Sequence, residues 1–444
     1  MFDQNEFDFF FPEVALDNVA IGSDGLRSTD VKKKYNTIRK EKMNTINNGN
    51  YHPVPYKEKL ILKGRGKVPR LISIPSIADR FILKGLNRQI QLLLIEKQKM
   101  PQQLVGELSK NISDYKNYLR LDLTTFYDNM NRDLIYSILK KRQIDERFLK
   151  LITAIIEQKT LPATKVNFMG IPQGLAISNS LAQIYLENLN QDISEYVRGE
   201  VKVIRYVDDI IILFNDRAYR RVFDKTIHLL KTKYSVEVNK EKTKYGKLKN
   251  NKIDFLGYRF EIDENGYSKV TVRDSSISQI CKKIINTITK FKKGNISFDK
   301  YKDKLIFQLR IRISGLVIAK DDQIKKYGWI FFYSQITDLS VFFRLDKYLK
   351  KQLYKNFKNS QVTYIYSKLT GFVRSYFEMK KNKAYSRYAV RPDEYNDDEK
   401  KEFLSRIANI NVENLDLNKL DSKFKKEVFK CVKSLEEDVS VHIS

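Results

Sequence analysis

Cysteine is scarce in this 444-residue chain, which contains only Cys281 and Cys431. Two cysteines without metal-ligand spacing exclude a disulfide framework and a structural zinc site, and such usage is typical of a reducing compartment. The sequence also lacks a run of about eighteen apolar residues, which a membrane-spanning helix needs. Its acidic start lacks the basic-then-apolar order of a signal peptide. We therefore expect a cytoplasmic protein with no membrane partner.

Acidic residues are also few relative to basic ones. The chain has 54 Asp and Glu against 82 Lys and Arg, which gives a net charge of +28. The first thirty residues and residues 393–444 are acidic on balance, so the surplus lies between them. A globular surface this positive repels itself, and an extended polyanion is the simplest partner that offsets the repulsion. A charge excess that serves only solubility is the alternative.

The remaining composition predicts a globular chain of several subdomains. Hydrophobic residues make up 42% of the sequence, and a chain of this length divides into about two to four subdomains. No internal repeat or low-complexity linker interrupts it. Local patterns predict a helix over 31–50, a hairpin over 60–75, a helix over 77–98, and strands over 118–123, 203–205, 210–214, 254–260 and 268–272. Beyond residue 275 nearly everything looks helical.

Two adjacent carboxylates, Asp208 and Asp209, follow Tyr206 and Val207 between two apolar runs. This pattern predicts strand, tight turn, strand. Paired carboxylates in an apolar frame are costly unless a cation offsets them. In a hairpin turn both can face one side and bind Mg²⁺, which prefers oxygen ligands. An acidic turn without function is the alternative, because Asp is common in turns generally.

A third carboxylate, Asp122, ends an earlier apolar strand, and Phe126 and Tyr127 follow it. Asp122 could complete a two-metal site with the later acidic pair. The alternative is a helix capped by Thr124 or Thr125, with Asp122 paired to a lysine.

Between the acidic segments lies a glycine-containing stretch, residues 170–178, with the sequence GIPQGLAIS. Its glycines let the backbone approach a ligand closely, and we expect a long helix to follow.

In this order the three segments resemble the palm motifs of reverse transcriptases. Residues 122–127 resemble the first motif, Pro172-Gln173-Gly174 with Ser178 the second, and residues 206–209 the third. Further matches are the lysine-bearing fourth motif at 239–244, the primer grip at 255–258, and the fingers segment of bacterial enzymes at 70–75 with Asp79-Arg80. The resemblance covers roughly residues 57–272. One departure is Asn179, where many relatives carry proline; a helix start should tolerate either.

The resemblance implies an α/β right-hand polymerase fold of fingers, palm and thumb with a helical C-terminal extension. The expected divisions are 1–118 for the N-terminal segment and fingers, 119–262 for the palm with inserted fingers helices, 263–325 for a thumb-like part, and 326–444 for the extension. Asp122, Asp208 and Asp209 would bind two Mg²⁺ ions, for which Mn²⁺ could substitute.

Other residues receive substrate roles from the same resemblance. Arg70, with Lys63 or Arg65, would hold the triphosphate. Gln173 and Gly174 would form the template-nucleotide pocket. Lys242 would protonate the pyrophosphate, although Lys244 is close enough to compete for this assignment. Tyr127 would exclude a 2′-hydroxyl as a sugar gate, and an ordinary core aromatic is its alternative.

The implied function is RNA-directed DNA synthesis from dNTPs on an RNA template, which could be a dedicated non-coding RNA. The compact polymerase with a helical extension resembles bacterial anti-phage and abortive-infection enzymes, with retron and group II intron enzymes as neighbours. A homo-oligomer is compatible with this reading. An RNA-directed RNA polymerase and a catalytically silent RNA-binding protein are the alternatives from other classes. Tyrosines among basic residues over 354–395 predict a role in priming or template handling, or simply packing between helices.

Overall fold

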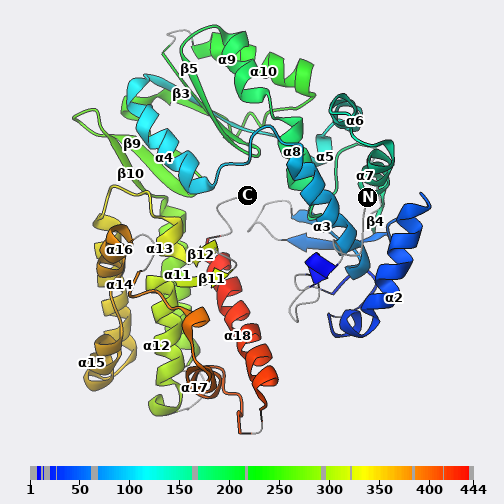
Figure 1. Ribbon diagram of the computed structural model, residues 1–444. Coiled ribbons are helices and arrows are strands. Elements are labelled where there is room, and N and C mark those ends of the chain that lie inside the picture. The colour runs from blue at the N-terminus through cyan, green and yellow to red at the C-terminus, as the bar shows by residue number, and fades with distance from the viewer. Residues whose placement is uncertain are drawn as a thin grey trace. The chain divides into compact units, whose positions relative to one another are not determined.

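The computed structural model describes residues 8–11, 14, 21–26, 28–61, 69–162, 169–215, 219–291, 297–320, 323–382, 386–413 and 415–439. The chain forms two compact units, one of Met1–Lys99 with Tyr115–Lys247 and the other of Met100–Asp114 with Leu248–Ser444 (Figure 1). Each unit contains both helices and strands, which confirms the predicted α/β class. The division into four parts at 118, 262 and 325 stays a prediction.

A four-stranded antiparallel sheet forms the centre of the first unit. Its order is β5-β6-β3-β7, with β3 at Asn117–Asp122, β5 at Val201–Tyr206, β6 at Asp209–Phe214 and β7 at Lys244–Lys247. The apolar run Ile210–Phe214 is fully buried in β6, as expected for a β-branched central strand. The three strands predicted over residues 118–214 are therefore confirmed.

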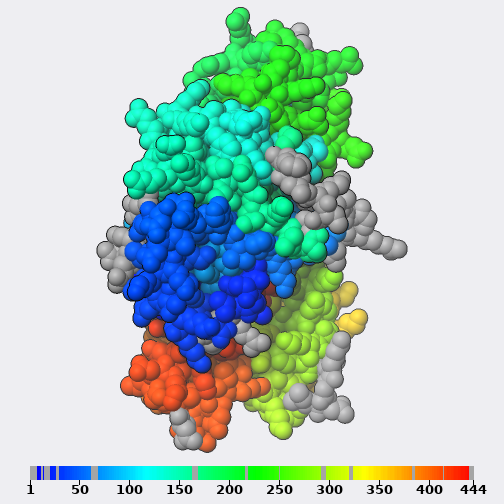
Figure 2. Space-filling model, turned by 90° about the vertical axis from the view of Figure 1, so that its right-hand side faces the viewer, coloured from blue at the N-terminus to red at the C-terminus, as the bar shows by residue number. Residues whose placement is uncertain are grey.

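The first unit also contains eight helices among its described residues. They are α2 (Ser28–Asn47), α3 (Ile77–Leu92), α5 (Phe126–Asn129), α6 (Arg132–Lys141), α7 (Glu146–Glu157), α8 (Ser178–Tyr185), α9 (Leu189–Val197) and α10 (Tyr219–Tyr234). Of these, α9 packs directly against β5 of this sheet. Two expectations were wrong in length: the helix from Ile77 ends at Leu92 rather than at 98, and the helix after the glycine stretch is broken between α8 and α9. On the face in Figure 2, the blue N-terminal residues and the blue-green residues of α6 and α7 lie side by side.

The predicted hairpin is confirmed as β1 (Tyr56–Ile61) and β2 (Arg70–Ile74). The strands are antiparallel, with Ile61 opposite Arg70, and β1 also pairs in parallel with β4 (Thr160–Leu161). The tip, including Lys63 and Arg65, lies outside the described residues.

The second unit contains two small sheets and a set of helices. One sheet has the order β10-β9-β8, formed by Ser268–Val272, Tyr258–Ile262 and Ile253–Phe255. The other is a hairpin of β11 (Leu316–Lys320) and β12 (Gln323–Tyr327). The helices are α4 (Pro101–Asn111), α11 (Asp274–Lys290), α12 (Phe298–Ser314), α13 (Trp329–Phe332), α14 (Ser340–Asn356), α15 (Asn359–Lys368), α16 (Phe372–Lys381), α17 (Asp397–Glu402) and α18 (Leu417–Glu437). Single helical turns occur at Ile112–Asp114, Leu248–Asn250 and Pro392–Glu394, with a π-helix at Phe403–Ile407.

Two expectations are corrected in this unit. The strand expected over 254–260 is broken, because Leu256 and Gly257 both take positive φ angles (49° and 83°) and turn the chain between β8 and β9. The expectation of helix beyond 275 missed the β11–β12 hairpin. Gly315, with φ of 78°, ends α12 and leads directly into it. No helix among the described residues is long and apolar enough to cross a membrane.

Candidate active site

The acidic turn between β5 and β6 has the geometry that the sequence predicts. Tyr206 and Asp209 are paired across the hairpin, so Val207 and Asp208 form its tip. Val207 has a φ of 53°, a strained conformation for a β-branched residue. The Arg205 guanidinium supports the turn by donating to the Val207 carbonyl (3.3 Å) and to the Leu186 carbonyl (3.1 Å).

The antiparallel register of β3 and β6 places Asp122 directly opposite Asp209. The third carboxylate, Asp208, lies close enough to Asp122 and Asp209 for their charges to change its pKa. Burial raises the pKa of Asp208, and the neighbouring Asp209 and Asp122 carboxylates raise it further, while a backbone hydrogen bond and the Arg70 guanidinium oppose the shift. The structure therefore brings together Asp122, Asp208, Asp209 and Arg70 from three separate segments of the sequence.

Two of the three carboxylates have a cationic partner. Arg120 donates from Nε and Nη2 to the two carboxylate oxygens of Asp209, at 3.1 and 3.2 Å. Lys242 Nζ lies 2.8 Å from Oδ2 of Asp122, so the alternative in which Asp122 pairs with a lysine describes one contact correctly. Lys244 begins β7 and is paired with Arg120 across the sheet.

The donor set fits a divalent cation by its chemistry. Three carboxylates supply the hard oxygen ligands that Mg²⁺ prefers. The pKa of Asp208 is raised first by burial and then by repulsion from Asp209 and Asp122, and a bound cation would offset both. Within the described part of the chain, however, no group of three or more His, Cys, Asp or Glu side chains is arranged to hold a metal ion. Asp209 and Asp122 are held by Arg120 and Lys242 instead.

Tyr127 lies beside these carboxylates. Burial raises its pKa to about 12, with further contributions from Asp208 and Tyr206 and an opposing one from Arg70. The backbone of the glycine stretch is packed against it, because Ile171 N donates to the Tyr127 carbonyl at 2.8 Å. Gly170 has a φ of 75°, and a Cβ there would lie 2.3 Å from the carbonyl oxygen of Asp128. Only glycine permits this approach of the two motifs.

The same stretch is tied to the strand that carries Arg70. Ser73 N on β2 donates to the Gln173 carbonyl at 2.7 Å. A Cβ on Gly174 would lie 2.5 Å from the Ile72 side chain. Ser178 Oγ donates to the Pro172 carbonyl at 2.6 Å and closes the loop. The structure thus positions Gln173 and Gly174 next to β2, while their role in a template pocket stays a prediction.

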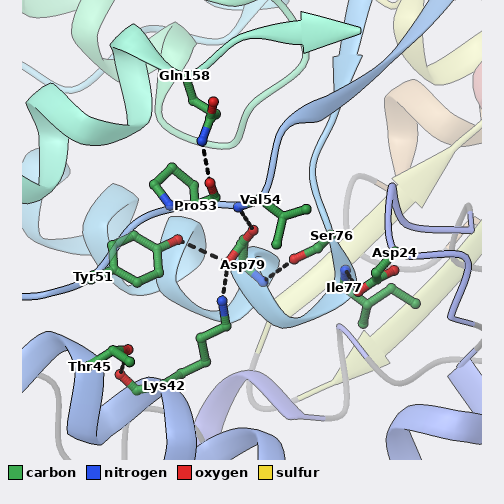
Figure 3. Close-up of polar contacts among 10 residues, drawn as sticks. All are labelled: Asp24, Lys42, Thr45, Tyr51, Pro53, Val54, Ser76, Ile77, Asp79 and Gln158. Carbon is green, nitrogen blue, oxygen red and sulfur yellow. Dashed lines mark hydrogen bonds and ion pairs between the residues drawn. The ribbon is translucent and has the colours of Figure 1, made fainter.

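Asp79, from the fingers segment, has a structural role (Figure 3). Its fully buried carboxylate accepts hydrogen bonds from Lys42 Nζ (2.7 Å), Tyr51 Oη (3.0 Å) and Val54 N (3.1 Å). Burial raises the pKa of Tyr51 well above its ordinary value, and Asp79 adds to the shift. This network joins α2, residues 51–54 and α3, the helix whose N-terminus Ser76 caps.

Sequence reasoning missed Arg120 and Arg205. Arg120 lies two positions before Asp122 on the same face of β3, and this spacing is the local signal that could have drawn attention to it. Arg205 has no such signal, because β5 contains no acidic residue. A cavity of about 510 Å³ in the same unit is lined by α6, α7, His52 and Pro53 and contains none of the predicted site residues.

Comparison with known proteins identifies the domain that contains this geometry. Residues 61–260 match the family described as reverse transcriptase (RNA-dependent DNA polymerase). These residues form a reverse transcriptase domain. The domain contains every residue that the sequence predicts for the site, and enzymes of this family generally use divalent metal ions. Together with the sheets and helices described above, the match confirms the predicted α/β right-hand polymerase fold.

Individual relatives of the reverse transcriptase domain are distant. Protein YkfC of Escherichia coli (strain K12) is 21% identical over 203 residues, which are 42% of this chain and 53% of that protein. The chain therefore spans about half the length of this curated relative. Among solved structures, the apo telomerase of Candida tropicalis truncated from its C-terminal domain has 16% identity and a TM-score of 0.38, with 55% of this chain and 61% of that chain covered. The telomerase of Candida albicans in complex with the TWJ fragment of telomeric RNA has 12% identity and a TM-score of 0.42, with 87% and 69% covered.

Proposed function

We propose that this protein is an active RNA-directed DNA polymerase that transfers nucleotides from dNTPs to a growing DNA strand on an RNA template. One observation carries the proposal: inside the reverse transcriptase domain, Asp122 lies opposite Asp209 across β3 and β6, with the half-buried Asp208 close enough to feel the charge of both. The central basic surplus supports a nucleic-acid partner.

Asp122, Asp208 and Asp209 would hold two Mg²⁺ ions, or Mn²⁺ in their place. When bound, such ions activate the primer 3′-hydroxyl and stabilise the triphosphate and the leaving pyrophosphate. The remaining roles fall to residues of the chain itself. Lys242, whose Nζ is 2.8 Å from Asp122, would donate a proton to the pyrophosphate. Arg70 would bind the triphosphate, together with Lys63 or Arg65.

The sugar and base of the substrate would contact the two segments that pack together at Gly170, which are the segment with Tyr127 and the glycine-containing stretch 170–178. Tyr127, half-buried beside Asp208 and Arg70, would exclude the 2′-hydroxyl of a ribonucleotide. Gln173 and Gly174 would line the template-nucleotide pocket. The polymerase would work in the cytoplasm, with RNA, DNA product and dNTPs as its partners.

Metal-dependent incorporation of labelled dNTP on a primed RNA template tests the activity. We expect synthesis with Mg²⁺, none with EDTA, and none with a folded Asp208→Ala variant. Asp224→Ala, an exposed change on α10 of the same unit, is the matched control and should retain activity. Near-normal incorporation by Asp208→Ala would overturn the assignment of the site.

We also propose that the polymerase serves bacterial anti-phage defence. The support is the resemblance in architecture, a compact polymerase followed by a helical extension. Phages should form fewer plaques on cells that express the wild-type protein than on cells that express Asp208→Ala. Equal plaque counts across a broad phage panel would contradict this role. Sequencing the nucleic acid that co-purifies with the protein would separate a dedicated non-coding RNA template, as for retron-type enzymes, from bulk RNA.

A further inference from the structure

The helix α14 presents an unusual solvent-facing side in the second unit. Phe343 and Tyr354 on this helix are 59% and 50% exposed. At 3.6 residues per turn, Phe343, Lys347, Lys350 and Tyr354 fall within an arc of about 60°, and the two aromatic residues are about 16 Å apart along the axis. They therefore form one stripe of two aromatic rings with lysines between them.

The charge on this side of α14 is entirely positive. Its exposed cations are Arg344, Lys347, Lys350, Lys351 and Lys355. The single acidic residue of the helix, Asp346, accepts hydrogen bonds from Phe372 N (2.6 Å) and Val373 N (3.1 Å) and so caps the start of α16. Among the described residues, no carboxylate forms an ion pair with any of the five cations. We call this surface, made of the five cations with Phe343 and Tyr354, the α14 face.

On other helices of the same unit, exposed lysines form ion pairs with carboxylates. Lys302 on α12 pairs with Asp299, Lys419 on α18 with Asp416, and Lys430 on α18 with Glu427, each within one helical turn. Such pairs are the ordinary pattern of a solvated helix surface. The α14 face departs from this pattern because it combines unpaired like charges, which repel one another, with exposed aromatic rings.

The opposite side of α14 holds it firmly in the unit. Phe342, Leu345, Leu349 and Leu353 are buried, and the helix packs against α11, α15 and α16 (Figure 1). Tyr348 Oη also donates to the Cys281 carbonyl of α11 at 3.3 Å. The α14 face is therefore presented by a rigid element, so that little conformational entropy is lost when a partner binds.

We propose that the α14 face binds single-stranded nucleic acid. Phosphates would contact the lysines and Arg344, and unpaired bases would stack on Phe343 and Tyr354. Charge complementarity selects a polyanion as the occupant. The exposed rings select a single strand, because in a duplex the base faces are already stacked on one another. This binding uses none of the polymerase site residues, and it rests on the proposed function only for the identity of the strand as template or product.

The test uses the full chain and fluorescence anisotropy with labelled 20-nucleotide oligo(U), oligo(dT) and a 20-base-pair duplex. The double variant Phe343→Ala/Tyr354→Ala should bind the single strands at least about tenfold more weakly. Duplex binding should change less than twofold. A preference of the wild-type protein for oligo(U) would indicate template RNA as the natural occupant, and a preference for oligo(dT) would indicate product DNA; both support the proposal.

A second pair of variants tests the charge. Lys347→Gln/Lys350→Gln/Lys351→Gln should reduce the slope of log K against log salt for single strands by about 2, given about 0.7 per phosphate contact. The matched control is Lys419→Gln/Lys430→Gln on α18, whose lysines are paired and should leave the slope unchanged. Phe429→Ala, another exposed aromatic on α18, controls for the loss of a ring.

A conservative double variant distinguishes the loss of the aromatic rings from a loss of folding. Phe343→Tyr/Tyr354→Phe keeps both rings and should bind single strands like wild type. Unchanged single-strand affinity in the alanine double variant would overturn the proposal and leave the α14 face to another kind of partner. Equal losses for duplex and single strands would overturn the stacking that it requires.

Discussion

Arg120 on β3 forms a bidentate ion pair with Asp209 at the start of β6, through contacts of 3.1 and 3.2 Å. Arg120 lies two positions before Asp122 and therefore shares its face of the strand. As a result, the two adjacent carboxylates of the turn differ. Asp209 is paired with a cation on the neighbouring strand, while Asp208 is half-buried next to two like charges. Of the two adjacent carboxylates, Asp209 is therefore held by an ion pair, whereas the ionised form of Asp208 is destabilised by its surroundings.

Removal of Arg120 should shift the pH dependence of the polymerase. Arg120→Ala takes a positive charge away from the carboxylate group, so the protonated forms become easier to populate. The acidic limb of the kcat/KM profile should move to higher pH by about one unit, and Arg120→Lys should move it less. Arg147→Ala, an exposed change on α7, should leave the limb in place. An unmoved limb in Arg120→Ala would show that the pair does not influence the reacting carboxylates.

Asp208→Asn should separate activity from stability. Because the folded-state pKa of Asp208 is raised, its ionised form opposes folding at neutral pH, and stability falls as pH rises through that pKa. The neutral, similarly shaped amide removes this cost. The melting temperature, measured in EDTA, should therefore stay the same or rise. Incorporation, measured with Mg²⁺, should fall at least about a hundredfold. Thermal unfolding and dNTP incorporation measure the two effects.

Asp192→Asn is the contrasting control for this prediction. Asp192 forms an ion pair with Lys233 (2.6 Å) and accepts a hydrogen bond from Tyr234 Oη, and both contacts stabilise its ionised form. Its substitution should lower the melting temperature. A comparable loss of stability in Asp208→Asn would mean that Asp208 holds the fold together rather than serving the reaction.

The sequence was most informative where local pattern decides the structure. Apolar runs on both sides of Asp208 and Asp209 predict β5, β6 and their turn, because strand alternation and turn chemistry are short-range properties. The same holds for Asp122 at the end of β3. The positions of Arg120 and Arg205 relative to the carboxylates depend on strand register and on chain contacts far apart in sequence, which no local pattern contains.

The misassigned elements have physical causes of the same kind. Leu256 takes a φ of 49°, a conformation that a branched apolar side chain rarely adopts, so an apolar run that looks continuous is broken into β8 and β9. The hairpin of β11 and β12 follows α12 only because Gly315 takes a positive φ and packs against Phe331. Both features are imposed by tertiary packing, which overrides local propensity.

Tyr127 should control the choice between deoxyribonucleotides and ribonucleotides. Tyr127→Ala removes the ring beside Asp208 and makes room for a 2′-hydroxyl. The ratio of kcat/KM for dNTP to that for rNTP should fall at least about tenfold, since a lost steric contact of 1.4 kcal/mol is one order of magnitude. Tyr127→Phe keeps the ring and should retain the wild-type ratio. An unchanged ratio in Tyr127→Ala would assign Tyr127 to the hydrophobic core, where Phe126 is already buried.

Asp79 and Lys42 should prove essential to the attachment of α2 to α3. Asp79 is fully buried and the Lys42 side chain is 18% exposed, so Asp79→Ala leaves a lysine without its partner in a region with little water. Removing one partner of such a pair costs about 3–5 kcal/mol. A chain of two compact units need not unfold in one step. Amide hydrogen exchange is therefore the better measurement, because it reports the opening of each element separately.

In Asp79→Ala, exchange should accelerate in α2 and α3 while β6 keeps its protection. Lys42→Met should weaken the same helices, because it leaves the buried carboxylate without its cation. The double variant Asp79→Ala/Lys42→Met removes both charges at once, so it should lose less protection than the two single changes combined. Strictly additive losses would show that the two side chains do not interact in solution. Equal acceleration in β6 would show that the network in Figure 3 stabilises the whole first unit rather than the junction of these helices.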